Sequence, residues 1–151
     1  MSQRIDFYST APGAMKALGG VYSYLSQTDL SHSLLELVFL RVSQINGCAY
    51  CIDMHTQALH KADMPWHKIV LTQVWHESGA LFDAREQAAL AWAESLTLIA
   101  SRGAPDELFT QVQAVFSAKE IVDLNVAIGL MNTYNRLAIS LKKLPDSAPR
   151  D

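Results

Sequence analysis

The chain has 151 residues, half of them apolar and 18% charged, and its formal net charge at pH 7 is −3. A chain of this length typically forms one domain and buries about two thirds of its unfolded surface. The slightly acidic balance disfavours nucleic-acid binding, for which proteins use a basic surface. We therefore expect a single domain, spanning residues 1–151, without a nucleic-acid partner.

No stretch of the sequence approaches the roughly 18 consecutive apolar residues of a membrane-spanning helix. The N-terminal residues MSQRIDFYST contain no apolar segment of the kind found in a secretory signal. We therefore expect a cytoplasmic protein that does not bind membranes. Because disulfides are kept reduced in the cytoplasm, two neighbouring cysteines there indicate catalysis or metal binding rather than a structural crosslink.

Two helices are predicted in the first third of the chain. Apolar residues over 14–25 recur every three or four positions, which is the period of a helix. Residues 34–45 are almost all apolar, and this run is too long for an ordinary strand. Ser33 and Glu36 have the spacing of a capping box, yet Ser31 is an equally good N-cap, so Glu36 is free for another role.

The rest of the chain is also predicted to be helical. Pro145 and Pro149 indicate a frayed tail from about residue 145. The sequence contains no convincing strand pattern, repeat or interdomain linker. We predict an all-α, single-domain bundle of about six to seven helices. The later helices are expected from Cys48 to about Ala62, from Pro65 to about Glu77, after Asp83 to Ile99, after the break at Pro105 to Phe116, and after Ser117 to about Lys143.

The chain's only two cysteines, Cys48 and Cys51, lie in the segment GCAYCIDMH, which ends at His55. On a helix that begins at Cys48, Cys51 lies at i+3 and His55 at i+7, so all three side chains point to one side. A helix N-terminus and a neighbouring imidazolium both lower the pKa of a thiol. A C-x-x-C pair can also close a disulfide once one sulfur is oxidised. The pattern favours a redox couple that handles peroxides or disulfides.

Two other interpretations of the cysteine pair stay open. Cys48, Cys51 and His55 could supply three zinc ligands, but structural zinc sites usually pair two such clusters, and no second cysteine pair exists. The two cysteines could instead be buried thiols that act as small apolar side chains. A zinc-stabilised helical binding module is therefore the alternative to an enzyme.

Glu36 is the only acidic residue in its apolar helix, and a lone carboxylate is costly to bury without a partner. Together, Glu36, Cys48, Cys51 and His55 have the spacing E-x₁₁-C-x-x-C-x₃-H. This pattern resembles that of the alkylhydroperoxidase D (AhpD)-like family, within the carboxymuconolactone decarboxylase superfamily.

The resemblance implies an all-helical domain of the AhpD-like type, with its core over residues 34–141, usually assembled as a trimer or hexamer. It also implies thiol-dependent peroxidase or disulfide reductase activity on a small hydroperoxide, without a metal or another cofactor. An external dithiol or a protein thiol, for example that of a peroxiredoxin, would be the reductant. By position, Cys51 resembles the peroxidatic cysteine, Cys48 the cysteine that closes the disulfide, and Glu36 with His55 the proton relay.

Tyr50 departs from the family pattern, because well-known members carry a second histidine between the two cysteines. A phenol, whose unperturbed pKa is about 10, is a poor proton acceptor at neutral pH. We expect Tyr50 to line a substrate pocket. A second hypothesis lies within the same superfamily, a non-redox decarboxylase-like enzyme in which Glu36 and His55 perform acid–base chemistry.

Overall fold

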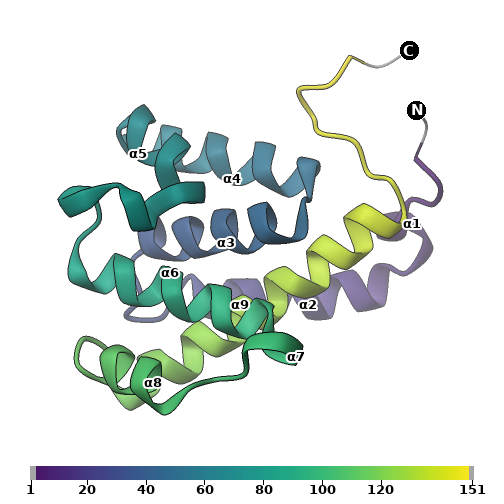
Figure 1. Cartoon of the computed structure of the whole chain (residues 1–151). Coiled ribbons are helices and arrows are strands. Elements are labelled where there is room, and N and C mark those ends of the chain that lie inside the picture. Colours follow the sequence, from purple (N-terminus) through teal and green to yellow (C-terminus); the bar gives the residue numbers. More distant parts are fainter. Residues whose placement is uncertain (1–2, 150–151) are drawn as a thin grey trace.

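The computed structural model describes residues 3–149, and every regular element in this range is helical (Figure 1). The predicted all-α class is therefore confirmed. Within this range seven α-helices have six or more residues, in line with the predicted six to seven, and two unpredicted α-helices have four residues each. The α-helices are α1 (Phe7–Thr10), α2 (Pro12–Leu25), α3 (His32–Asn46), α4 (Ala49–Lys61), α5 (Trp66–Leu71), α6 (Ala84–Thr97), α7 (Ile99–Arg102), α8 (Asp106–Gln113) and α9 (Ala118–Ser140), and two 3-10 segments are η1 (Thr72–Glu77) and η2 (Gly79–Leu81).

The segment before α1 lies beside the C-terminal end of α9 (Figure 1). The backbone N–H of Arg4 donates to the carbonyl of Leu141 at 2.8 Å, so the segment before α1 is held against the end of α9. The segment 141–149 contains no regular helix, and the last two residues of the predicted tail lie outside the described range. Within residues 3–149, no helix has the combination of length and apolar character needed to cross a membrane.

Ser31 rather than Ser33 caps α3. The Oγ of Ser31 accepts the backbone N–H of Leu34 at 3.2 Å, which satisfies one of the unpaired donors at the helix start. Glu36 is therefore not needed for capping. It is free for another role, as predicted, and its side chain is buried.

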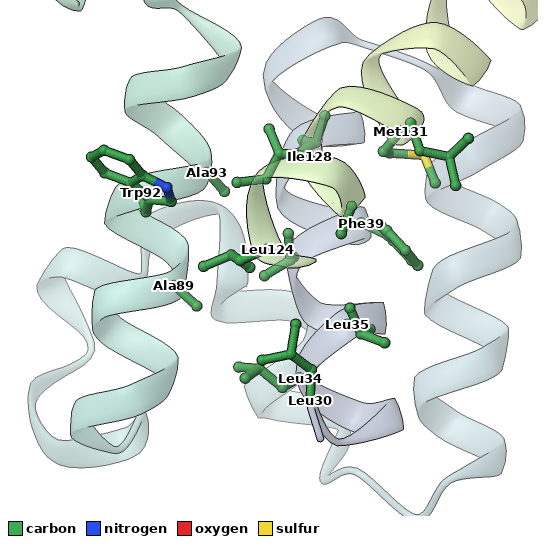
Figure 2. Packing of buried hydrophobic residues seen from close by; sticks show 14 of the residues in the cluster. Leu30, Leu34, Leu35, Phe39, Ala89, Trp92, Ala93, Leu124, Ile128 and Met131 are labelled. Atoms are coloured by element: carbon green, nitrogen blue, oxygen red, sulfur yellow. The ribbon is translucent and has the colours of Figure 1, made fainter. Parts of the chain in front are cut away.

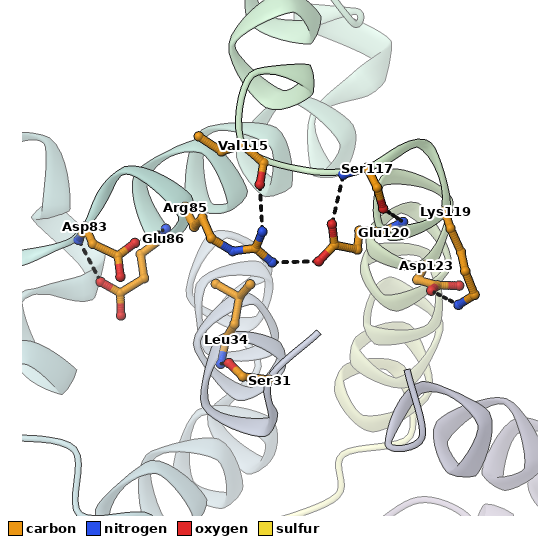
Figure 3. A network of polar contacts seen from close by, with 10 residues as sticks. All are labelled: Ser31, Leu34, Asp83, Arg85, Glu86, Val115, Ser117, Lys119, Glu120 and Asp123. Carbon is orange, nitrogen blue, oxygen red and sulfur yellow. Dashed lines mark hydrogen bonds and ion pairs between the residues drawn. The ribbon is translucent and has the colours of Figure 1, made fainter. Parts of the chain in front are cut away.

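Capping boxes fix the starts of α6 and α9. Asp83 pairs with Glu86 at the start of α6, and Ser117 pairs with Glu120 at the start of α9. Figure 3 shows both boxes and the side chain of Arg85, which donates to Glu120 at 2.8 Å. The predicted starts of both helices are confirmed, and an ion pair joins them.

The helix predicted after Pro65 is shorter than expected. α5 gives way to the 3-10 segment η1, in which Val74 has the non-helical backbone angles φ −128° and ψ 31°. In this conformation the indole N–H of Trp75 donates to Glu94 on α6 at 2.9 Å. A buried hydrogen bond to a distant helix outweighs local helix propensity here, because propensity is a weak preference that tertiary contacts override.

α3 lies at the centre of the bundle and is buried on almost all sides. It packs against α4, α6 and α9, and Figure 1 shows α4 and α6 on opposite sides of it. Every residue from 34 to 40 is buried, which explains why this helix is almost continuously apolar rather than amphipathic. In Figure 2 the core side chains between these helices are Leu34, Leu35 and Phe39 of α3, Ala89, Trp92 and Ala93 of α6, and Leu124, Ile128 and Met131 of α9.

Glu94 on α6 is a buried carboxylate that joins four segments of the chain. It accepts hydrogen bonds from Arg41 of α3 and Trp75 of η1, each at 2.9 Å. His76 lies 3.1 Å away, and Arg102 of α7 lies 3.3 Å away. Burial would raise the pKa of Glu94, but the hydrogen bonds from Trp75, His76 and Arg41 together lower it below its usual value.

We expect Glu94→Gln to destabilise the fold most at neutral pH. Because the folded-state pKa of Glu94 is lowered, its carboxylate stabilises the fold above about pH 4.3, and this contribution disappears as the pH falls through the lowered pKa. The variant should lose about 1–3 kcal/mol of unfolding free energy at pH 7 and depend less on pH in acid. Chemical denaturation at a series of pH values measures both effects. The exposed Glu107 supplies the control, since Glu107→Gln should behave as the parent protein does.

Candidate functional site

α3 and α4 form a tight hairpin that brings the predicted site residues together. α3 ends at Gly47, whose φ of +70° is the left-handed conformation that glycine adopts without steric cost. The backbone N–H of Cys48 donates to the carbonyl of Ser43 at 3.0 Å and closes the turn. α4 therefore runs back along α3, with Cys48 as its N-cap.

Glu36 and His55 face each other across this hairpin. Oε2 of Glu36 lies 2.7 Å from Nδ1 of His55, and both residues are about 2% exposed. The carboxylate accepts a hydrogen bond from the Nδ1–H group. In this tautomer Nε2 is the ring nitrogen with a free lone pair, which can accept a proton. Nε2 is buried and has no hydrogen-bond partner among residues 3–149. A substrate or a thiol can therefore use it.

Cys48 and Cys51 are in direct contact at the start of α4. Their Sγ atoms lie 2.6 Å apart as free thiols, and the backbone N–H of Cys51 donates to Sγ of Cys48 at 3.4 Å. Both residues are buried. The sulfurs of a disulfide lie about 2.05 Å apart, so closing this pair requires only a small further approach.

The two thiols hold their protons with different strength. The hydrogen bond from the Cys51 thiol lowers the pKa of Cys48, and the backbone N–H of Cys51 and the amide of Asn135 act in the same direction, against burial. The pKa of Cys51 is raised by its hydrogen bond to Cys48, by burial and by the charge of Cys48. Within the reduced pair, Cys48 is therefore the more acidic thiol, and Cys51 holds its proton more tightly. Cys51 must therefore pass its proton to a base before it can act as a nucleophile.

A cavity of about 330 Å³ opens onto Cys51, His55 and Glu36. Its other walls come from α1, α2, α4 and α9. This lining is aromatic and apolar, and consists of Phe7, Tyr8, Tyr22, Tyr50, Met54, Ala58, Met131, Tyr134 and Ala138.

Tyr50 lies in the wall of this cavity and is half-buried. The ammonium group of Lys143 lies 4.7 Å from the centre of its ring. Burial and the negative charge of neighbouring groups raise the pKa of Tyr50 to about 12. The phenol therefore stays protonated at neutral pH and does not accept a proton there.

Asn135 of α9 connects the end of α3 with the cysteine pair. It is fully buried, its Nδ2 donates to Oγ of Ser43 at 3.0 Å, and its Oδ1 accepts from Asn46 at 2.9 Å. These bonds fix which end of the amide is the donor, and that end lowers the pKa of both Cys48 and Cys51. The amide thus favours negative charge on the sulfurs.

Two residues near the site, Tyr22 and Asn135, are not indicated by the motif. Both lie far along the chain from the cysteines, on α2 and α9. Asn135 bonds to side chains of α3. Helical spacing is the signal that could have found it, because Asn135 lies one and two turns after the buried Met131 and Ile128, and a polar residue on a buried face needs a partner.

Two of the histidines outside the motif, His60 and His76, lie away from the site. The rings of His60 and Trp66 meet edge to face with their centres 5.9 Å apart, and His76 pairs with Glu94. Across the described part of the chain, no three side chains of His, Cys, Asp or Glu converge in a way that could hold a metal ion. The arrangement around Cys51 is thus one of a carboxylate, an imidazole and two thiols.

Comparison with known proteins gives a family assignment. Residues 12–95 match the model of the carboxymuconolactone decarboxylase family, a range that includes Glu36, Cys48, Cys51 and His55. The chain is 38% identical over 141 residues to the uncharacterized protein YdfG of Bacillus subtilis. This alignment covers 93% of this chain and 95% of YdfG.

Solved structures share the whole fold. A protein of unknown function from Agrobacterium tumefaciens, described as a candidate AhpD antioxidant defence protein, superimposes with a TM-score of 0.92 and 37% identity, over 99% of this chain and 100% of that chain. An uncharacterized peroxidase-related protein from Silicibacter has a TM-score of 0.82 at 23% identity, over 93% of this chain and 74% of that chain, and shows the same fold. The chain therefore belongs to the carboxymuconolactone decarboxylase family, as one of its AhpD-like members.

Proposed function

We propose that the protein is a thiol-dependent peroxidase that reduces organic hydroperoxides through a Cys48–Cys51 disulfide. The observation that carries this proposal is the direct contact of the two sulfurs beside a buried Glu36–His55 pair. Two adjacent thiols suit a reaction that removes two electrons and ends in a disulfide. Acid–base chemistry by Glu36 and His55 alone would need no second thiol. The description of the Agrobacterium relative as an antioxidant defence protein supports the same class of chemistry.

In the first step, Nε2 of His55 takes the proton of Cys51, and Glu36 stabilises the imidazolium that forms. The Cys51 thiolate attacks the terminal oxygen of the hydroperoxide, so an S–O bond forms while the O–O bond breaks. The leaving alkoxide takes the proton from His55 and departs as an alcohol. Cys51 is then a sulfenic acid, and the hydroperoxide has been reduced by two electrons.

In the second step, Cys48 attacks the sulfur of the Cys51 sulfenic acid, and hydroxide leaves and is protonated to water. The backbone N–H of Cys51 and the amide of Asn135, which both lower the pKa of Cys48, are still present after the first step and favour its thiolate for this attack. An external dithiol then reduces the disulfide by two successive exchanges and becomes a disulfide itself. A protein thiol, such as that of a peroxiredoxin, is a second candidate reductant. None of these steps draws on a metal or an organic cofactor.

The cavity supports an organic substrate rather than hydrogen peroxide. Its walls are aromatic and apolar, and burying apolar area yields about 25 cal/mol per Å². Hydrogen peroxide has no apolar surface and gains nothing from such walls. An alkyl or aryl hydroperoxide can bury its organic part among the tyrosines while its peroxide group reaches Cys51.

We expect a single equivalent of cumene hydroperoxide to remove both thiols of the parent protein, and a dithiol to restore them. Cys48→Ser should stop at a sulfenic acid that a dimedone reagent traps, and Cys51→Ser should keep its remaining thiol. His55→Ala should react about 10²–10⁴-fold more slowly, because Cys51 loses its base. Counting free thiols over time measures all four proteins.

The exposed His60, on the same helix, supplies a matched control, and His60→Ala should react at the parent rate. If the thiols of the parent protein stay reduced after addition of the hydroperoxide, the proposed peroxidase activity is refuted. The acid–base chemistry of Glu36 and His55 would then be the remaining candidate function.

Filling the cavity should remove the preference for an organic substrate. We expect kcat/KM of the parent protein to be at least about tenfold higher for cumene hydroperoxide than for hydrogen peroxide. Ala58→Phe places a ring in the cavity from α4 and should reduce this ratio. The rate with hydrogen peroxide serves as the internal control, since this small substrate still fits. An unchanged ratio would show that the substrate does not bind in this cavity.

Removing the amide of Asn135 should raise the pH at which the first thiol ionises. We expect the ultraviolet thiolate absorbance of Asn135→Ala to titrate about one pH unit higher than that of the parent, because a hydrogen bond to the thiolate is lost. Asn132→Ala is the matched control, since Asn132 shares the partner Asn46. Identical titrations of the Asn135 variant and the parent would contradict this role.

A further inference from the structure

The second oxygen of Glu36 has a partner that lies outside the cysteine motif. The hydroxyl of Tyr22, on α2, donates to Oε1 of Glu36 at 3.1 Å, while Oε2 meets Nδ1 of His55 at 2.7 Å. Tyr22 also forms part of the cavity wall. One side chain therefore contacts both the substrate cavity and the proton relay.

We propose that Tyr22 is a positioning residue that sets how strongly the Glu36–His55 pair holds its proton. The inference rests on the proposed function, because it concerns the relay of that same site. Tyr22 touches the carboxylate of the relay and acts through it on His55. The hydroxyl of Tyr22 bonds to the carboxylate and not to a sulfur, so its effect on Cys51 is indirect.

The contact with Tyr22 affects both the orientation and the charge of Glu36. With one oxygen bound to the phenol and the other to the imidazole, the carboxylate cannot rotate without breaking a hydrogen bond. The phenol also takes a share of the negative charge, which weakens the attraction of the carboxylate for the proton on His55. Without this donor, the carboxylate would hold an imidazolium more tightly, and His55 would be a neutral base only at higher pH.

The phenol acts as a donor and not as an acid or base. Burial, together with the charge and hydrogen bond of Glu36, raises the pKa of Tyr22 to about 12. The hydroxyl therefore stays protonated wherever the relay operates. Tyr22→Phe removes the donor and keeps the ring, whose centre lies 6.0 Å from that of Phe39, so the packing beside His55 is preserved.

A second imidazole, that of His32 on α3, lines a small pocket together with Tyr22 and Glu36, so the titration of His55 has to be read from its own assigned resonance. The pKa values of the other three tyrosines of the cavity are raised by burial and neighbouring charges. The pKa of Cys51 is raised chiefly by its hydrogen bond to Cys48. The ammonium of Lys143 lies 4.7 Å from the centre of the Tyr50 ring. The titratable groups that face Glu36 and His55 across the cavity are Tyr8 from α1, Tyr50 and Cys51 from α4, and Tyr134 from α9.

The experiment compares Tyr22→Phe with Tyr24→Phe. Tyr24 lies on the same helix and donates to Asp123 at 2.7 Å, away from the cavity, so its variant loses the same kind of bond. We expect the acid limb of the pH–rate profile for thiol oxidation to move up by about one pH unit in Tyr22→Phe. The rate at a pH on that limb should fall about tenfold, and Tyr24→Phe should follow the parent profile.

A second readout does not depend on activity. The ring proton resonance of His55, assigned with a His55→Asn variant, should titrate at higher pH in Tyr22→Phe than in the parent and in Tyr24→Phe. A resonance that titrates identically in all three would overturn the inference even if thiol oxidation is confirmed. A rate that falls equally at every pH would also overturn it, because it would show a packing role only. If the parent thiols do not react with peroxide, the proposed function fails, and the resonance still decides the role of Tyr22.

Discussion

The burial of α3 is the constraint on which the rest of the structure depends. A helix covered on almost all sides leaves few polar side chains to water, so its buried charged groups need partners inside the protein. Glu36 meets this requirement with His55 of α4, and Arg41 meets it with Glu94 of α6. The first pair lies in the candidate site, and the second ties η1, α6 and α7 to the centre of the bundle.

The turn from α3 into α4 also sets the chemistry of the thiols. Gly47 lets the chain reverse within two residues, so α4 begins at Cys48 and presents both sulfurs and His55 to α3 and α9. The thiols share one hydrogen bond and differ in how tightly they hold their protons. Cys51 faces the cavity beside His55, whereas Cys48 does not line it. This asymmetry suits a cycle in which one sulfur meets the substrate and the other closes the disulfide.

The outer helices contribute what the hairpin lacks. α1, α2 and α9 supply most of the aromatic wall of the cavity, and α2 and α9 add the polar contacts of Tyr22 and Asn135. A short hairpin could hold the four motif residues, but it could not exclude water from them. The cavity therefore depends on helices from both ends of the chain as well as on the hairpin.

The sequence by itself determined the helical class, the starts of α6 and α9, and the closeness of Cys48, Cys51 and His55, because helical period and capping chemistry are local. It also singled out Glu36, since a lone acid in an apolar helix requires a partner. Only the tertiary structure decided that Tyr22 and Asn135 reach the site and that the helix after Pro65 breaks into η1. These features arise from contacts between residues far apart in the chain, whose geometry no local pattern encodes. The order in which the thiols lose their protons is tertiary for the same reason, because it depends on burial and on the amide of α9.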